Sequence, residues 1–146
     1  MSSSVIQPYL MFGGRCEEAL AFYTSALGAQ VEMLMYFHQS PDPVPAGVLA
    51  PGFENKVMHC AFRIGKTSVL ASDGCNEGSN FSGFSLALSF ETVEETEKAF
   101  LALTDGGQVS MPLAKTFWSP SFGMLTDRFG VAWMVMTMDA NAGPSA

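Results

Sequence analysis

The sequence has few charged residues, and positive charge is the scarcer sign. Among 146 residues, seven are Lys or Arg and fourteen are Asp or Glu, so the formal net charge is −7. The basic residues are scattered along the chain and form no basic run. A nucleic-acid groove needs a clustered positive field, so we exclude nucleic acid as a partner.

Long hydrophobic runs are also missing. No apolar stretch could span a bilayer, and the N-terminal "MSSSVIQPYLMF" lacks the basic region and long apolar segment of a secretory signal. We therefore expect a soluble, cytoplasmic protein with no membrane partner. Cysteine is scarce too: Cys16, Cys60 and Cys75 are an odd number at spacings that fit no disulfide framework. Free thiols in a reducing compartment are the expectation.

What the sequence does contain is apolar residues, at 48% of the chain, and an internal repeat. The stretch "GAQVEM" (28–33) returns 78 positions later as "GGQVSM" (106–111). Laying residues 6–33 over 84–111 without a gap gives nine identities in 28 positions. A match of this length in one register indicates a duplicated structural unit.

Both copies contain the same order of expected elements. An alternating, strand-like stretch comes first, then a stretch with apolar spacings of three and four that predicts a helix. Thr92 and Glu95 form a plausible capping box for the second helix, and glycine ends both helices. New strands then begin at Gln30 and Gln108, and two more strands close each copy, the first pair turning at Gly65–Lys66.

The sequence therefore predicts a β-α-β-β-β unit written twice. This is an α+β fold of two pseudo-symmetric modules, about 5–75 and about 81–138, in a single domain 1–146, with the helices on the outside. Strand parity divides each first strand into two faces. Large apolar residues should pack under the helices: Ile6, Pro8, Leu10 and Phe12 in one copy, and Phe84, Leu86, Leu88 and Phe90 in the other.

The opposite faces carry small, polar or sulfur-containing side chains, which favour a ligand cavity over a packed core. The alternative is that small residues merely lie where two sheets approach closely. Polar side chains on a face that is not solvent-facing need polar partners, which favours the cavity. The predicted lining is Gln7, Tyr9, Met11, His59, Ala61, Arg63, Ala71, Asp73, Ser85, Trp118, Met134 and Met136.

Several motifs resemble the vicinal oxygen chelate superfamily, which includes glyoxalase I, bleomycin-resistance proteins and extradiol dioxygenases. They are "FYTSALGAQV" after the first helix and "TDRFGVAWMV" in the second half. Together with "HCAFRIGKTSVLASD", they resemble its PhnB-like branch, often labelled 3-demethylubiquinone methyltransferase-like. The resemblance implies sheets enclosing a central cavity, and a homodimer. It does not bring methyl transfer, because no glycine-rich loop of an adenosylmethionine-binding βαβ unit is present.

The resemblance also implies one metal ligand on the first and last strand of each module. The matching positions hold Gln7, Ala71, Ser85 and Met134. Divalent cations prefer several carboxylate or imidazole ligands, which this set lacks. We therefore predict no metal cofactor of the usual kind, although a divalent ion at a divergent site stays open.

Four residues are candidates for chemistry, each with a structural alternative. His59 could act as a base or ligand, or be a core histidine with a backbone partner. Asp73 could orient His59 or cap a turn, and Arg63 could bind a carboxylate or phosphate or lie in solvent at a hairpin tip. Trp118 could form a pocket wall or pack in a core or interface.

Three functions follow from these alternatives. The first is a metal-independent protein that binds a small organic molecule. The second is an enzyme of lyase, isomerase or dioxygenase type with a divergent or absent metal site. The third is a fold kept for a structural or regulatory role. The Pro-rich connection 38–56 could be a lid, a surface loop or a dimer arm.

Overall fold

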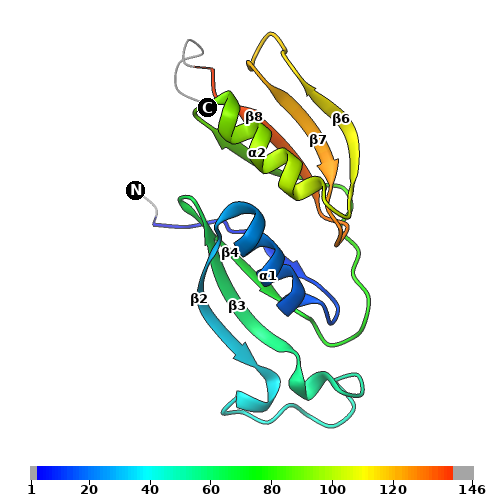
Figure 1. Cartoon of the computed structure of the whole chain (residues 1–146). Coiled ribbons are helices and arrows are strands. Elements are labelled where there is room, and N and C mark those ends of the chain that lie inside the picture. The colour runs from blue at the N-terminus through cyan, green and yellow to red at the C-terminus, as the bar shows by residue number, and fades with distance from the viewer. Residues whose placement is uncertain (1–2, 140–146) are drawn as a thin grey trace. The chain divides into compact units, whose positions relative to one another are not determined.

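The computed structural model describes residues 3–139 and divides into two compact units, Met1–Ser79 and Asn80–Ala146 (Figure 1). Each unit is one helix on a four-stranded mixed sheet, which confirms the predicted α+β fold of two β-α-β-β-β units. Unit 1 contains β1 (Tyr9–Met11), α1 (Cys16–Leu27), β2 (Gln30–Tyr36), the 3-10 helices η1 (Phe37–Gln39) and η2 (Phe53–Asn55), β3 (Val57–Ile64) and β4 (Thr67–Ser72). Unit 2 contains β5 (Leu86–Phe90), α2 (Val93–Thr104), β6 (Gln108–Ala114), β7 (Phe122–Thr126) and β8 (Ala132–Thr137).

Both sheets have the same topology. The strand order is β1-β4-β3-β2 in unit 1 and β5-β8-β7-β6 in unit 2. In each, the first strand pairs in parallel with the last, and the other pairs are antiparallel. Each unit is thus closed by a pairing between the two ends of its own sequence.

The two helices begin in different ways. Thr92 caps α2, because its Oγ1 accepts a hydrogen bond from the backbone N–H of Glu95 at 3.2 Å. The N-cap of α1 is Arg15, whose side chain makes no such bond. Instead, the carboxylate of Asp73 accepts the N–H groups of Gly14 and Cys16, both at 2.8 Å. A residue from the end of β4 therefore caps α1.

The helices show where the ungapped repeat fails. The buried residues of α1 are Cys16, Ala19, Leu20 and Tyr23, and those of α2 are Thr96, Ala99, Phe100 and Leu103. These two sets match at a shift of 80, although the strands on either side keep the shift of 78. The identical pairs at Ala21 and Ala99, and at Phe22 and Phe100, are therefore not equivalent in structure. Ala21 is exposed, whereas Ala99 is buried.

The first strands are shorter than predicted. Leu10 and Phe12 are buried as expected, but Ile6 is 99% exposed and Phe84 is 46% exposed. In the parallel registers Tyr9 lies opposite Leu70 and Leu86 opposite Trp133, so Ile6 only reaches the first residue of β4 and Phe84 falls one residue before the start of β8. The prediction that Ile6 and Phe84 pack under the helices is wrong for this reason.

A β-bulge recurs at the same place in both units. The register shifts between Val31 and Met33 on β2, and between Val109 and Met111 on β6. The extra residue is Glu32 in unit 1 and Ser110 in unit 2. A bulge places two residues opposite one residue of the neighbouring strand. Glu32 therefore lies on the same side of the sheet as Arg63 of β3, with which it forms an ion pair.

The side chain of Asp127, just after β7, has a structural role. Its Oδ1 accepts the N–H groups of Phe129 and Val131, at 2.8 and 3.1 Å, and its Oδ2 accepts Nε1 of Trp133 at 2.8 Å. These bonds fix the turn between β7 and β8 and hold the buried indole. Within residues 3–139, no helix is long and apolar enough to cross a bilayer.

Candidate functional site

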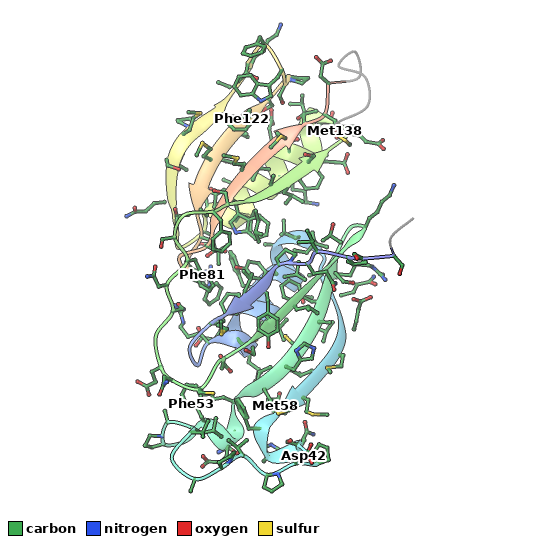
Figure 2. The ribbon with its side chains drawn as sticks, turned by 180° about the vertical axis from the view of Figure 1, so that it is seen from behind. Asp42, Phe53, Met58, Phe81, Phe122 and Met138 are labelled. Carbon is green, nitrogen blue, oxygen red and sulfur yellow. The ribbon has the colours of Figure 1, made fainter. Side chains whose placement is uncertain are left out.

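The candidate site lies on the sheet face of unit 1 that faces away from α1, here called the open face. Figure 1 shows α1 lying across one face of the sheet, and Figure 2 looks onto the other from behind. Strand register places its residues in three rows. The rows are Ser68–Arg63–Gln30, then Tyr9–Leu70–Ala61–Met33, and then Met11–Ser72 with His59–Met35.

Tyr9, on the edge strand β1, and His59, on the inner strand β3, form a stacked pair on this face. Their ring centroids are 5.9 Å apart with an interplanar angle of 27°. His59 is half-buried and Tyr9 is 45% exposed. Among the described residues, none hydrogen-bonds to the phenol or the imidazole. The alternative of a core histidine with a backbone partner therefore does not describe His59.

Arg63 lies at the edge of the open face and is already paired. Its guanidinium donates to Gln30 Oε1 and lies 3.5 Å from a carboxylate oxygen of Glu32. Glu32 also accepts the hydroxyl of Ser68, and Gln7 donates its side-chain N–H to the backbone oxygen of Ser68 at 2.9 Å. This network occupies both Arg63, the candidate for binding a carboxylate or phosphate, and Gln7, which stands at a superfamily metal position.

The prediction that Ala71 lines the open face is wrong. Ala71 pairs with Leu10 and Cys60, is fully buried, and lies on the side of the sheet that α1 covers. The residue on the open face is its neighbour Leu70, which pairs with Tyr9. In unit 2 Met134 pairs in the same way with Ala87, so Leu70 and Met134 are equivalent positions. A shift of one residue along a strand moves a side chain to the opposite face.

Asp73 is also on the helix side, so its predicted place in the lining is wrong. Only 2% of its surface is exposed. Besides the two N–H groups before and at the start of α1, its carboxylate accepts the backbone N–H of Val57 at 2.8 Å. A carboxylate that accepts three backbone N–H groups is a structural cap, which agrees with the structural alternative for Asp73. The predicted cap was on the following turn, whereas Asp73 caps the beginnings of α1 and β3.

The two buried thiols lie next to this cap. Cys16 Sγ and Cys60 Sγ are 3.7 Å apart, and both residues are fully buried. The S–H···S contact with Cys60 raises the pKa of Cys16, and burial and the nearby Asp73 carboxylate raise it further. A thiol held in its neutral form is a poor nucleophile, which excludes Cys16. The hydrogen bond from Cys16 lowers the pKa of Cys60, but Cys60 is fully buried, so no substrate reaches it and neither residue is a candidate for catalysis.

Unit 2 presents a similar open face with different chemistry. Met111, Met124 and Met134 lie side by side in register with Ala87, and Met136 pairs with Ser89 and Phe122. Trp118 packs edge-on against Phe122, with centroids 5.4 Å apart, which places it near Met136. Ser85 lies just before β5 and is half-buried. In the equivalent register positions, Ala87 and Phe122 stand where unit 1 has Tyr9 and His59, and Met134 and Met124 stand where it has Leu70 and Ala61.

Sequence reasoning missed several residues of the open face of unit 1, among them Met33, Glu32 and Leu70. The positions of Met33 and Glu32 on this face depend on the β-bulge in β2, and no pattern in the sequence predicts that bulge. Leu70 could have been found by counting in twos from the hairpin at Gly65–Lys66, because Ala61 pairs with Leu70 across it. The predicted cavity between the two modules stays a prediction.

The residues at the superfamily metal positions do not fit a divalent cation. The first-strand positions hold Gln7, whose amide is bonded to β4, and Ser85. On the last strands, Ala71 was the predicted position in unit 1, but the register equivalent of Met134 is Leu70, so the two positions hold Leu70 and Met134. None of the four carries a carboxylate or an imidazole, which divalent ions prefer. Within residues 3–139, no three His, Cys, Asp or Glu side chains are grouped closely enough to hold a metal ion.

A family model described as 3-demethylubiquinone-9 3-methyltransferase matches residues 4–136. The chain belongs to this family. It is 34% identical over 138 residues to another protein, YjdN of Escherichia coli (strain K12), covering 89% of this chain and 92% of YjdN. Protein PA1353 from Pseudomonas aeruginosa is 40% identical, with a TM-score of 0.80 over 93% of this chain and 98% of that one.

Two further structures place the 3-demethylubiquinone-9 3-methyltransferase family within a wider fold. A Bacillus cereus protein described as a putative member and a PhnB protein is 28% identical, with a TM-score of 0.74 over 92% of this chain and 99% of its own. A glyoxylase/bleomycin resistance protein/dioxygenase domain from Frankia sp. EAN1pec shares the fold at 14% identity, with a TM-score of 0.65 over 97% and 96% of the two chains. The PhnB-like resemblance and the glyoxalase-like fold are confirmed.

Proposed function

We propose that this protein binds a small organic molecule on the open face of unit 1, without a divalent metal. The observation that carries the proposal is the Tyr9–His59 pair. Its rings are accessible, and its polar atoms have no hydrogen-bond partner among the described residues. Polar groups of this kind beside apolar side chains supply the few directional contacts that orient a ligand.

The surroundings of the pair support this proposal. Met11, Met33 and Leu70 provide apolar surface beside the rings, and Met11 and Met33 are 55% and 43% exposed. Methionine adapts its shape and is common on surfaces that accept varied ligands. The family name refers to methyl transfer, but each sheet has a single parallel strand pair and not the series of βαβ units that binds such cofactors.

The same imidazole supports a second candidate, an enzyme of lyase or isomerase type. His59 has no hydrogen-bond partner among the described residues, so its nitrogens are free to accept or donate a proton when a substrate lies on the face. In this candidate the chemistry is proton transfer by His59, with no step that uses a metal.

We also propose that the chain forms a homodimer. The outer strands β2 and β6 each expose apolar side chains, including Val31 and Met33 on one and Val109 and Met111 on the other. Exposed apolar edge strands are surfaces that pair with another chain. Light scattering after size-exclusion chromatography tests this: a dimer mass supports the proposal, and a monomer mass at the same concentration contradicts it.

The binding proposal has an internal control, because His59 and His38 are the only two histidines. His38 also stacks on a tyrosine, Tyr36, with centroids 5.6 Å apart, but this pair lies at the end of β2. The side-chain hydrogen bond to Glu17 raises the pKa of Tyr36. Because Glu17 is on α1, this bond places the Tyr36 ring on the helix side and not on the open face.

The experiment is a thermal-shift screen of small organic molecules, followed by NMR of the two imidazole C–H signals. A hit should shift the His59 signals and leave those of His38 in place. Its affinity should fall at least tenfold in Tyr9→Leu and stay unchanged in His38→Leu. A hit that moves only His38, or that binds both variants equally well, contradicts the proposal. Turnover of a hit that is lost in His59→Gln would select the enzyme candidate.

A further inference from the structure

The open face of unit 1 also restricts the chemical class of its ligand, and this inference rests on the proposed function. The middle row runs Tyr9–Leu70–Ala61–Met33 across four neighbouring strands. Ala61 has the smallest side chain of the row and is half-buried, so the row is lowest there, between the larger Leu70 and Met33. A surface of this form accepts a flat molecule that lies along the sheet.

The side chains around this floor favour aromatic rings. The Tyr9 and His59 rings present a π surface on which another ring can stack, in an offset or edge-on geometry. Met33 pairs with Ala61, and Met35 pairs with His59, so two thioethers lie on the other side of the floor. Sulfur-to-ring contacts are favourable, so these two side chains favour aromatic over aliphatic ligands.

The charges of unit 1 disfavour an anion. Arg63 is the one Lys or Arg in the rows of the open face, and Glu32 and Gln30 already bind it. Lys56 donates to the backbone oxygen of Gly14, and Lys66 lies in the hairpin turn beyond the strands. Unit 1 has seven Asp and Glu and four Lys and Arg, a net charge of −3. A carboxylate or phosphate would therefore find no uncommitted cation in these rows.

We infer that the open face of unit 1 binds planar aromatic molecules that carry no negative charge. Stacking on Tyr9 and His59 holds the ring plane, and the methionines close around its edges. The paired Glu32 and Arg63 form the border that selects against anions. A neutral or cationic ring system meets no unfavourable charge there, because the nearest ion pair is compensated within the network.

Four probes of similar size test the two parts of this inference. They are acridine, which is planar and neutral, proflavine, a planar cation, anthracene carboxylate, a planar anion, and adamantane amine, a cation that is not planar. Titrations are followed by the imidazole signals of His59, with those of His38 as the reference. Acridine and proflavine should bind at least tenfold more tightly than the other two.

A variant gives the sharpest test of the charge selection. Glu32→Gln removes the carboxylate that compensates Arg63, and binding of anthracene carboxylate should rise at least tenfold. The matched control is Glu18→Gln, which breaks the exposed ion pair of Arg15 and Glu18 on α1 and should change nothing. Both variants keep a side chain of the same size, so neither should unfold the protein.

The outcomes separate this inference from the proposed function. If anthracene carboxylate binds the unaltered protein as tightly as proflavine, the charge selection is wrong and the binding face stands. If adamantane amine binds as tightly as proflavine, the preference for planar rings is wrong. If none of the four probes shifts His59, the inferred class is overturned, while hits of other chemistry from the thermal-shift screen would still support the binding face.

Discussion

The carboxylate of Asp73 accepts the backbone N–H of Cys16 at 2.8 Å, across 57 positions of sequence. Its second oxygen accepts the N–H of Val57 at the start of β3. One buried side chain thus joins the end of β4, the beginning of α1 and the beginning of β3. The helix would otherwise begin without a side-chain cap, because Arg15 provides none.

Asp73→Ala should therefore destabilise the protein strongly. The substitution leaves three buried N–H groups without their acceptor, and losing such bonds costs roughly 3 kcal/mol or more in free energy of unfolding. Urea denaturation measures the change. Asp105→Ala is the control, since Asp105 is exposed and its ion pair with Arg128 is of the kind that contributes ~0–1 kcal/mol. Equal effects of the two substitutions would contradict the capping role.

The three cysteines should react at very different rates. Cys75 is exposed, whereas Cys16 and Cys60 are buried, in contact with each other, and the pKa of Cys16 is raised by that contact and by burial. An aromatic disulfide reagent should label one thiol quickly in the native protein and the other two only at the rate of unfolding. In denaturant all three should react at once. In Cys75→Ser the fast phase should disappear. A fast phase of two or three thiols would show that the buried pair is accessible.

Removal of metal should not affect the protein. The four superfamily metal positions hold Gln7, Leu70, Ser85 and Met134, which give a divalent ion no charged ligand. Dialysis against a chelator should leave both the thermal midpoint and the affinity for any hit unchanged. Plasma mass spectrometry after incubation with nickel, zinc, manganese or iron should find less than stoichiometric metal. A bound ion in one-to-one ratio that raises the midpoint would show a rewired site.

Gly123→Ala should destabilise unit 2 through a steric clash. A Cβ at this position would lie 2.8 Å from Phe100 and 3.0 Å from the backbone oxygen of Met111. Overpacking of this kind costs about 1–3 kcal/mol in free energy of unfolding. Phe100→Leu should relieve part of the clash, so that the double variant is more stable than the sum of the single effects predicts. Strictly additive effects would place the cost elsewhere.

The fold was predictable from sequence where the backbone pattern repeats. The repeat at a shift of 78 holds on the strands, since Gln30 and Gln108 both begin one and the bulges coincide. It fails on the helices, where the buried faces match at a shift of 80. A helix can rotate about its own axis, with its connecting loops adjusting, while the strands keep their register. Sequence identities such as Phe22 with Phe100 do not reveal such a rotation.

The candidate site was predictable only in part. Parity placed Tyr9, Met11, His59, Ala61 and Arg63 on one face, and they lie there. It failed for Ala71 by a single residue. Asp73 could not be placed by parity, because its role depends on backbone N–H groups from two distant segments. The pairing of Arg63 with Glu32 also needed the bulge, which is set by tertiary structure.

The parallel pairing of β1 with β4, and of β5 with β8, has a consequence for the ancestry of the chain. Each half already contains every partner of its own hydrogen-bond ladder, so a gene of half this length encodes a complete sheet. Tandem duplication of such a gene requires no new strand pairing. The open faces of the two copies now differ, because Ala87 and Phe122 of unit 2 occupy the register positions of Tyr9 and His59, and Met134 and Met124 occupy those of Leu70 and Ala61.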